Sequence, residues 1–205
     1  METEEIYLSH LPRQCIAVAL KYRHLELEIN HTISSICSPF CRRCKGGCCK
    51  AEICVESTSS YWLRLVRTVE SHSLVQFDET RGWLTSNGCR ISVGRPPLCY
   101  EFLCDKIFEN IPRGSFSRSF KELSKLLSLV GKNALGNRHL VTLSSRAISS
   151  KLNFKKIETR IAAATESFER YKNDLKCEQP IKSTSYPILN LPSVRRKNDS
   201  CHRQH

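Results

Sequence analysis

Residues 41–49 read Cys-Arg-Arg-Cys-Lys-Gly-Gly-Cys-Cys, and this stretch decides more about the fold than any other. A Cys-x-x-Cys turn lets two thiolates converge on one ion, and the paired glycines let the backbone turn tightly enough to return a third sulfur. The basic residues between the cysteines favour thiolate over thiol. The stretch therefore predicts an irregular metal-binding loop.

Eight of the chain's 12 cysteines lie between residues 41 and 104. We interpret all eight as candidate metal ligands: Cys41, Cys44, Cys48, Cys49, Cys54, Cys89, Cys99 and Cys104. Neighbouring side chains of extended backbone point to opposite faces. Cys48 and Cys49 therefore serve two sites, or one of them binds the metal and the other packs.

The second group of cysteines carries a similar geometric condition. If residues 98–111 formed one helix, Cys99 and Cys104 would lie about 140° apart around its axis. Both can bind one ion only if Cys99 precedes the helix, in an extended Pro-Pro-Leu-Cys turn. Of the two, Cys99 is the stronger candidate. Four further cysteines are not expected to be ligands: Cys15, Cys37, Cys177 and Cys201.

Zinc and iron–sulfur clusters both accept four thiolates, and the spacing does not decide between them. The repeated Cys-x-x-Cys run of bacterial ferredoxins does not occur in the sequence. His72 is the one histidine inside the cysteine-rich region. We interpret all the histidines considered as solvent-facing residues rather than ligands: His10, His24, His31, His72 and His139.

Helices are predicted on both sides of the cysteine-rich loop. Apolar residues recur at spacings of three and four from Leu11 to Ile36, which is typical of an amphipathic helix packed on its own domain. Cys15 lies on this stripe as a small buried hydrophobe. Ser38-Pro39 should end the helix.

Further elements are expected after Cys54. A helix capped by Ser57, Thr58 or Ser59 should come first. Residues 83–93 should form a β-hairpin around Ser86-Asn87-Gly88. Three helices should follow, over residues 98–111, 120–134 and 148–175.

The predicted fold is mainly α with a small β-hairpin, and with the irregular cysteine-rich metal-site loop packed between helices. We divide the chain into an N-terminal amphipathic helix (1–36), a cysteine-cluster metal-binding domain (37–111) and a C-terminal helical region (112–177). Residues 178–205 are rich in Pro, Ser, Lys and Asn, which predicts a disordered tail.

Composition narrows the class of protein further. The chain has 205 residues, 40% of them hydrophobic, and a formal net charge of +12. No stretch approaches the roughly 18 consecutive apolar residues of a membrane span. The acidic start, Met-Glu-Thr-Glu-Glu, is unlike a signal peptide. We therefore expect a cytoplasmic protein whose cysteines stay reduced and bind metal.

The cysteine pattern as a set resembles the YkgJ-type cysteine-cluster family, described as zinc- or iron-chelating domains. The match consists of the Cys-x-x-Cys-x-x-x-Cys-Cys run from Cys41, then Gly88-Cys89, then Arg95-Pro96-Pro97-Leu98-Cys99, with Cys104 behind it. It covers residues 37–108. The sequence departs from the pattern at Gly82, where family members often carry another cysteine. The resemblance implies a metal or iron–sulfur site, with a flagellin lysine methylase among the distant relatives.

Three functions remain open at this point. The chain can be a metal-binding module that also binds a protein partner. It can be an iron–sulfur redox or group-transfer protein. A zinc-containing nucleic-acid-binding protein is disfavoured, because the basic residues are scattered and no zinc-finger ligand pattern occurs. Whether the protein is an enzyme stays open, and Glu101 and Asp105 are more simply solvated than catalytic.

Overall fold

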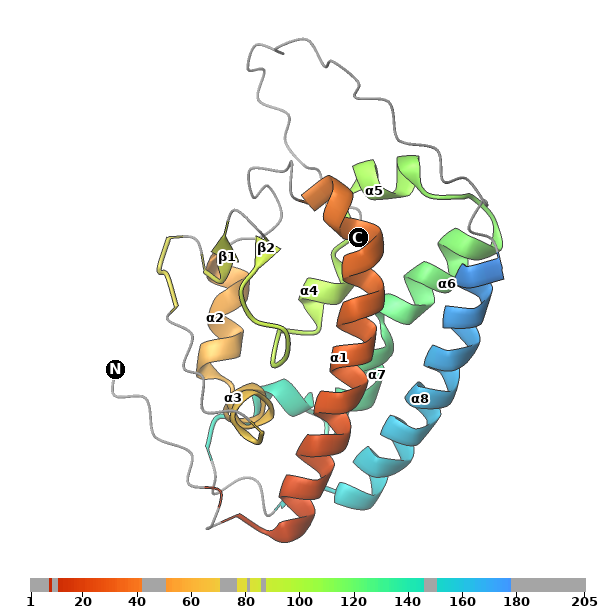
Figure 1. Ribbon diagram of the computed structural model, residues 1–205. Helices are drawn as coiled ribbons and strands as arrows, with labels where there is room; N and C mark the ends of the chain where they lie inside the picture. Colours follow the sequence, from red (N-terminus) through yellow and green to blue (C-terminus); the bar gives the residue numbers. More distant parts are fainter. Residues whose placement is uncertain are drawn as a thin grey trace.

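The computed structural model describes residues 8, 11–41, 51–70, 77–80, 82–85, 88–145 and 151–177. Over these residues the chain is mainly helical, with one small antiparallel sheet, so the predicted fold class is confirmed (Figure 1). Several residues discussed above lie outside the described ones: Cys44, Cys48, Cys49, Cys201, His10, His72 and the whole predicted tail.

The N-terminal helix α1 runs over Arg13–Cys41. Its buried side is the predicted apolar stripe, with Val18, Tyr22 and Ile29 almost fully enclosed. The prediction that Ser38-Pro39 ends the helix is wrong, because Pro39 lies inside it. A proline removes one backbone hydrogen bond from a helix. Because Pro39 lies in the last turn of α1, no later helical turn depends on that bond.

The other elements follow α1 in this order: α2 (Ala51–Ser59), α3 (Tyr61–Thr68), β1 (Leu84–Thr85), β2 (Gly88–Cys89), α4 (Leu98–Glu101), α5 (Asp105–Asn110), α6 (Ser115–Ser124), α7 (Leu126–Gly131), the short 3-10 helix η2 (Leu140–Thr142) and α8 (Phe154–Cys177). Within these described elements, no helix has both the length and the apolar character needed to cross a membrane.

The segment before α3 differs from its prediction. Residues 51–59 form helix α2, so Cys54 lies on a helix and not in the irregular loop. The capping residue of α3 is Ser60, whose side chain accepts a hydrogen bond from the backbone N–H of Leu63 at 3.2 Å. The sequence placed the cap one to three residues too early, because α2 already occupies those serines and threonines.

The predicted hairpin is confirmed in a short form. Strands β1 and β2 pair antiparallel, with Leu84 opposite Cys89 and Thr85 opposite Gly88. Gly88 has a φ of +103°, a backbone conformation that favours glycine. Gly88 is thus the residue at which the chain leaves the turn and β2 begins.

Two predicted helices are interrupted. Residues 98–111 form α4 and α5, separated at Phe102–Cys104, where the backbone leaves the helical region. Residues 115–131 form α6 and α7, separated at Lys125. The last helix starts at Phe154, and its buried stripe of Ile157, Ile161, Ala164 and Phe168 agrees with the predicted one.

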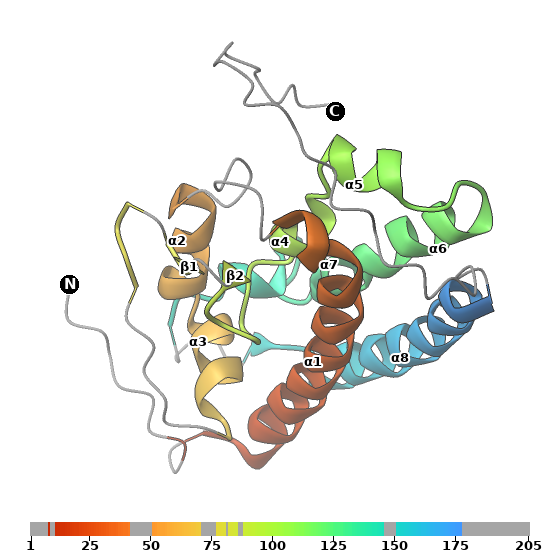
Figure 2. The same ribbon diagram turned by 45° about the horizontal axis from the view of Figure 1, so that its top comes forward.

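Figures 1 and 2 show α1 between two groups of elements. On one side, α6, α7 and α8 pack with α1 into what we call the helical body. On the other side lie α2, the hairpin and the chain that leads through residues 90–97 into α4, which we call the thiol layer. Helix α3 contacts both α1 and α2. One apolar core runs through the helical body, and its largest buried side chains include Tyr22, Trp62, Phe120, Leu127, Leu140 and Phe168.

Candidate metal centre

Three of the candidate ligands belong to three different elements of the thiol layer. Cys54 lies on α2, Cys89 on β2 and Cys99 in the first turn of α4. The pKa of Cys99 is raised to about 12, first by desolvation and then by the neighbouring thiols of Cys54 and Cys89. Cys54 and Cys89 also pack in one small cluster with Trp83 and Ile91. The three thiols therefore lie in the same region of the thiol layer.

The environment of each thiol differs. Cys54 is buried, and desolvation is the main cause of its raised pKa, while a backbone hydrogen bond from Trp83 acts in the opposite direction. Cys99 is exposed as a residue, yet enough protein surrounds its sulfur for desolvation to dominate. Cys99 lies in the first turn of α4, so the condition that it precede the helix in an extended turn is not met. The break after α4 nevertheless removes the single-helix geometry that separated Cys99 from Cys104.

Gly82 brings the start of the hairpin against Cys54. Its φ is +61°, and a Cβ built there would lie 2.7 Å from the Cys54 Sγ. No side chain fits this approach without displacing the sulfur. The position at which the chain departs from the YkgJ-type pattern therefore faces a candidate ligand.

Cys41 and Cys104 lie on two helices that contact each other: Cys41 is the last residue of α1, and Cys104 is the N-cap of α5. Both cysteines are partly buried and pack against the core of the helical body. Cys37, one turn before Cys41, is buried. The three remaining candidates, Cys44, Cys48 and Cys49, occur in the sequence between Cys41 and α2, outside the described residues.

Among the residues that the structure describes, no group of three or more His, Cys, Asp or Glu side chains is arranged to hold a metal ion. Cys54, Cys89 and Cys99 are thus not arranged as three ligands of one ion. None of the seven cysteines whose side chains are described forms a disulfide. Cys15 is fully buried in α1, and burial raises its pKa to about 11, as expected of a core thiol.

Sequence analysis missed Glu26, which holds the loop before α4. Its side chain is fully buried, and the carboxylate accepts hydrogen bonds from the backbone N–H of Gly94 at 2.8 Å and of Arg95 at 2.9 Å. The Tyr100 hydroxyl donates a third, at 2.8 Å. Burial raises the pKa of Glu26 despite these bonds. Glu26 falls four residues after Tyr22 and three before Ile29, so a lone carboxylate on the apolar stripe was the available signal.

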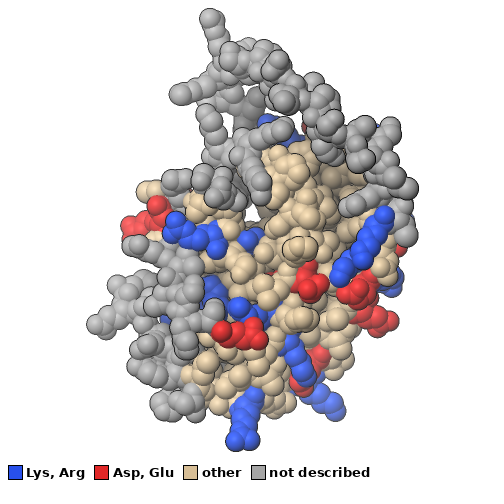
Figure 3. All heavy atoms as spheres, in the orientation of Figure 1, with Lys and Arg blue, Asp and Glu red and all other residues tan. Residues whose placement is uncertain are grey.

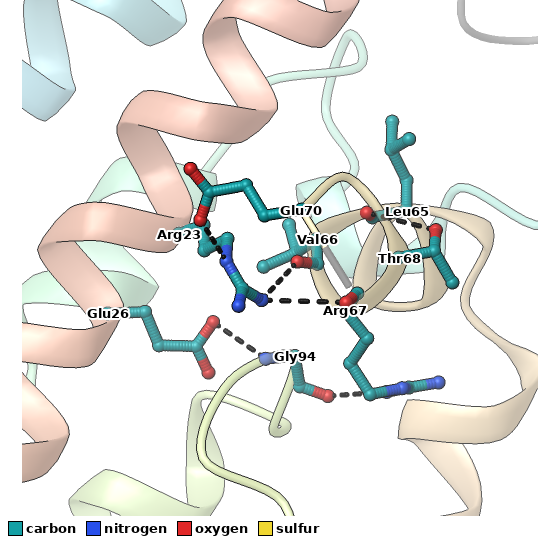
Figure 4. A network of polar contacts seen from close by, with 8 residues as sticks. All are labelled: Arg23, Glu26, Leu65, Val66, Arg67, Thr68, Glu70 and Gly94. Atoms are coloured by element: carbon teal, nitrogen blue, oxygen red, sulfur yellow. Dashed lines mark hydrogen bonds and ion pairs between the residues drawn. The ribbon is translucent and has the colours of Figure 1, made fainter. Parts of the chain in front are cut away.

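Arg67 on α3 contacts the same loop from the other side, as Figure 4 shows. Its guanidinium donates to the Gly94 carbonyl at 2.8 Å and to the Ser57 carbonyl of α2 at 2.6 Å. Desolvation lowers its pKa to about 10. The Ser57 hydroxyl in turn accepts a hydrogen bond from the Trp83 indole at 2.6 Å. Arg67 therefore links α2 and the loop before α4.

Arg95 brings a positive charge to the thiols. Its Nε donates to the Ile91 carbonyl at 2.6 Å, and its guanidinium lies 5.9 Å from the centre of the Tyr100 ring. Its charge lowers the pKa of Cys54 and Cys99, against the larger effect of desolvation. A cation at this place favours the thiolate form that binds metal.

The remaining candidates have structural roles or face solvent. Glu101 accepts a hydrogen bond from the Ser128 hydroxyl of α7, and Asp105 is exposed in the first turn of α5. His24 and His31 are exposed on α1, as predicted. His139 is different, because its ring packs against Gly131 and Nε2 lies 3.1 Å from the Ser128 carbonyl.

The chain matches no protein-family model, no curated protein and no solved structure with which it was compared.

Proposed function

We propose that the protein is a metal-chelating cysteine-cluster protein whose thiols bind zinc or an iron–sulfur cluster. The observation that carries the proposal is the placement of Cys54, Cys89 and Cys99 in one layer: Cys54 and Cys89 pack in one cluster, and both influence the ionisation of Cys99, up to 45 residues away in sequence. A folded chain gains little from placing thiols side by side unless they share a ligand, because their ionised forms repel one another.

The donor set fits such a group. Thiolate sulfur is the ligand that both S₄ zinc sites and iron–sulfur clusters use. The proposal takes Cys54, Cys89 and Cys99 as ligands, although the described residues do not arrange them around one ion. It assigns the rest of the shell to the Cys-x-x-Cys-x-x-x-Cys-Cys run at residues 41–49. Arg95 supplies a compensating charge, since a four-thiolate zinc site has a net charge of about −2.

The bound group can be a zinc ion or an iron–sulfur cluster, and the two imply different functions for the protein. A colourless zinc site would stabilise the thiol layer and present it to a protein partner. An iron–sulfur cluster would carry electrons or take part in group transfer, as the resemblance to methylase-type relatives implies. Both alternatives require a reducing compartment such as the cytoplasm, because the cysteine ligands must not be oxidised to disulfides.

Nucleic-acid binding receives no support from the described residues on the face drawn in Figure 3. On the face drawn in Figure 3, Lys and Arg side chains are interspersed with Asp and Glu. Binding to nucleic acid typically requires a continuous basic patch or stripe. We therefore retain metal binding alone as the proposed function.

Substitution of single cysteines tests the proposal. We expect Cys99→Ser and Cys44→Ser to lower both the metal content per chain and the melting temperature, because each removes a ligand whose binding energy stabilises the fold. Metal content is measured by elemental analysis of protein purified without oxygen.

Two matched controls separate metal loss from general damage. Cys201→Ser should change neither quantity. Cys15→Ala should lower the melting temperature without lowering metal content, because Cys15 is enclosed in the core of the helical body. Full metal content in both Cys44→Ser and Cys99→Ser would contradict the proposal.

A further inference from the structure

The carboxylate of Glu26 is costly where it lies. It is fully buried, on a helix face otherwise made of apolar residues such as Tyr22 and Ile29. Burial of a charged or polar group is unfavourable unless hydrogen bonds replace its water, and an apolar side chain would fill this face without that cost. The function of Glu26 must therefore be sought in the groups that it contacts.

Those groups lie at both ends of one turn. Glu26 Oε1 accepts from the backbone N–H of Arg95 at 2.9 Å and from the Tyr100 hydroxyl at 2.8 Å. The residues between them are Pro96-Pro97-Leu98-Cys99. Two prolines restrict the backbone of this turn. One carboxylate oxygen thus holds both ends of a stiff segment whose last residue is Cys99.

The other carboxylate oxygen extends the contact to the elements of Cys89 and Cys54. Oε2 accepts from the Gly94 N–H at 2.8 Å, while the Gly94 carbonyl accepts from Arg67, which also binds the Ser57 carbonyl of α2. Arg95 reaches back to Ile91, two residues after Cys89. Each of the three thiol-bearing elements is therefore connected to Glu26 through at most three hydrogen bonds and the short stretches of backbone between them.

Gly94 shows how closely this arrangement is fitted. Its φ is +68°, and a Cβ there would lie 2.4 Å from the Leu63 carbonyl oxygen and 2.6 Å from Arg67 Cγ. The loop cannot shift toward α3, because the backbone of α3 already touches it. Glu26 on one side and α3 on the other leave a single position for the loop.

We infer that Glu26 is a positioning residue of the thiol site: it fixes the turn at residues 95–100 and thereby sets where the Cys99 sulfur lies relative to Cys54 and Cys89. This inference rests on the proposed function, since it concerns the same thiols. Residues that orient metal ligands without touching the metal commonly affect affinity as much as some ligands do.

Titration of the full-length chain with Co²⁺ tests the inference. The chain is first freed of metal with a chelator under anaerobic conditions, and thiolate-to-cobalt absorption bands then report both affinity and ligand geometry. We expect Glu26→Gln to weaken Co²⁺ binding about 10- to 100-fold and to change the shape of the bands. Glutamine cannot accept from Gly94, Arg95 and Tyr100 at once without turning its amide N–H₂ toward a donor.

Three further variants make the result specific. Tyr100→Phe removes one hydrogen bond to Glu26 and should weaken Co²⁺ binding less, but in the same direction, even if Glu26→Gln does not fold. Glu28→Gln alters a half-exposed carboxylate of the same helix, which lies 3.5 Å from Lys172, and should change neither affinity nor bands. Ile157→Ala destabilises α8 away from the thiols and should lower stability alone.

The outcomes distinguish the two proposals. If the unaltered chain binds no Co²⁺, the zinc form of the proposed function fails and the inference fails with it. If it binds Co²⁺ and both Glu26→Gln and Tyr100→Phe bind equally well with the same spectrum, the positioning role is wrong while the metal site stands. Equal weakening by Ile157→Ala would also overturn it, because loss of stability would then explain the effect.

Discussion

In the helical body, apolar side chains hold the elements together, whereas the thiol layer combines a few apolar contacts with a set of buried polar groups. Leu127 and Phe168 are almost entirely enclosed among the apolar residues of α1, α6, α7 and α8. The thiol layer has a small apolar cluster of its own, whose buried members are Cys54, Trp83 and Ile91. The described residues of the layer contribute only two buried side chains, Val93 and Tyr100, to the main core.

This difference has a consequence for stability. An apolar cluster of three buried residues contributes little free energy compared with the conformational entropy of the segment that it orders. The hydrogen bonds that Glu26 accepts and Arg67 donates compensate for part of this loss of entropy. A bound metal would supply stabilisation where apolar burial is smallest, as in other small cysteine-rich units.

The largest effect is expected from the helical body. Phe168→Ala should lower the free energy of unfolding by about 3–5 kcal/mol, because it leaves a cavity under α8. Urea denaturation followed by circular dichroism measures this loss. Folded Phe168→Ala protein should keep its full metal content; loss of metal from the still-folded variant would mean that the two regions do not differ as described.

A somewhat smaller effect is expected in the thiol layer, from Gly94→Ala. The substitution combines a positive φ with contact to the backbone of α3, so we expect a loss of about 2–5 kcal/mol. Gly136→Ala is the matched control, because its φ is +61° and nothing lies within 4 Å of the added Cβ. It should cost only about 1–2 kcal/mol. Equal losses in the two variants would show that the loop is not closely packed against α3.

Sequence reasoning succeeded where one kind of residue repeats at a regular spacing. The stripe from Leu11 to Ile36 and the stripe of α8 follow directly from helical periodicity. The hairpin was likewise recoverable from its Asn-Gly signal. Helix ends were less predictable: α1 continues through Pro39, and residues 98–111 break at Phe102–Cys104. These boundaries depend on contacts made with other elements.

The polar contacts of the thiol layer could not be predicted in the same way. Glu26 lies 68 residues from Gly94 and 74 from Tyr100, and no local pattern links them. The same holds for Arg67, whose partners lie on two different segments. Clustering of cysteines in sequence did identify Cys54, Cys89 and Cys99 as candidates. It did not predict which of the eight would become neighbours, because that depends on the position of α2.

The smallest effect concerns pH, and it belongs to the helical body. Desolvation lowers the pKa of His139. An unfolded histidine takes up a proton at higher pH than His139 does, so its contribution to stability is complete above about pH 6.5 and is lost as the pH falls through the lower folded pKa. His139→Gln should therefore flatten the acid side of the stability profile, at a cost near neutral pH of about 1 kcal/mol or less. Parallel profiles for the two proteins, measured by urea denaturation between pH 5 and 8, would contradict this assignment.

Elemental analysis, combined with an absorption spectrum of the anaerobically purified chain, tests the central claim most directly. We predict a stoichiometric thiolate-bound group: either zinc with no visible absorption, or iron and sulfide with a broad brown band near about 400 nm. Protein that is folded, fully reduced at its cysteines and free of both metals, and that takes up neither when they are supplied, would contradict the account.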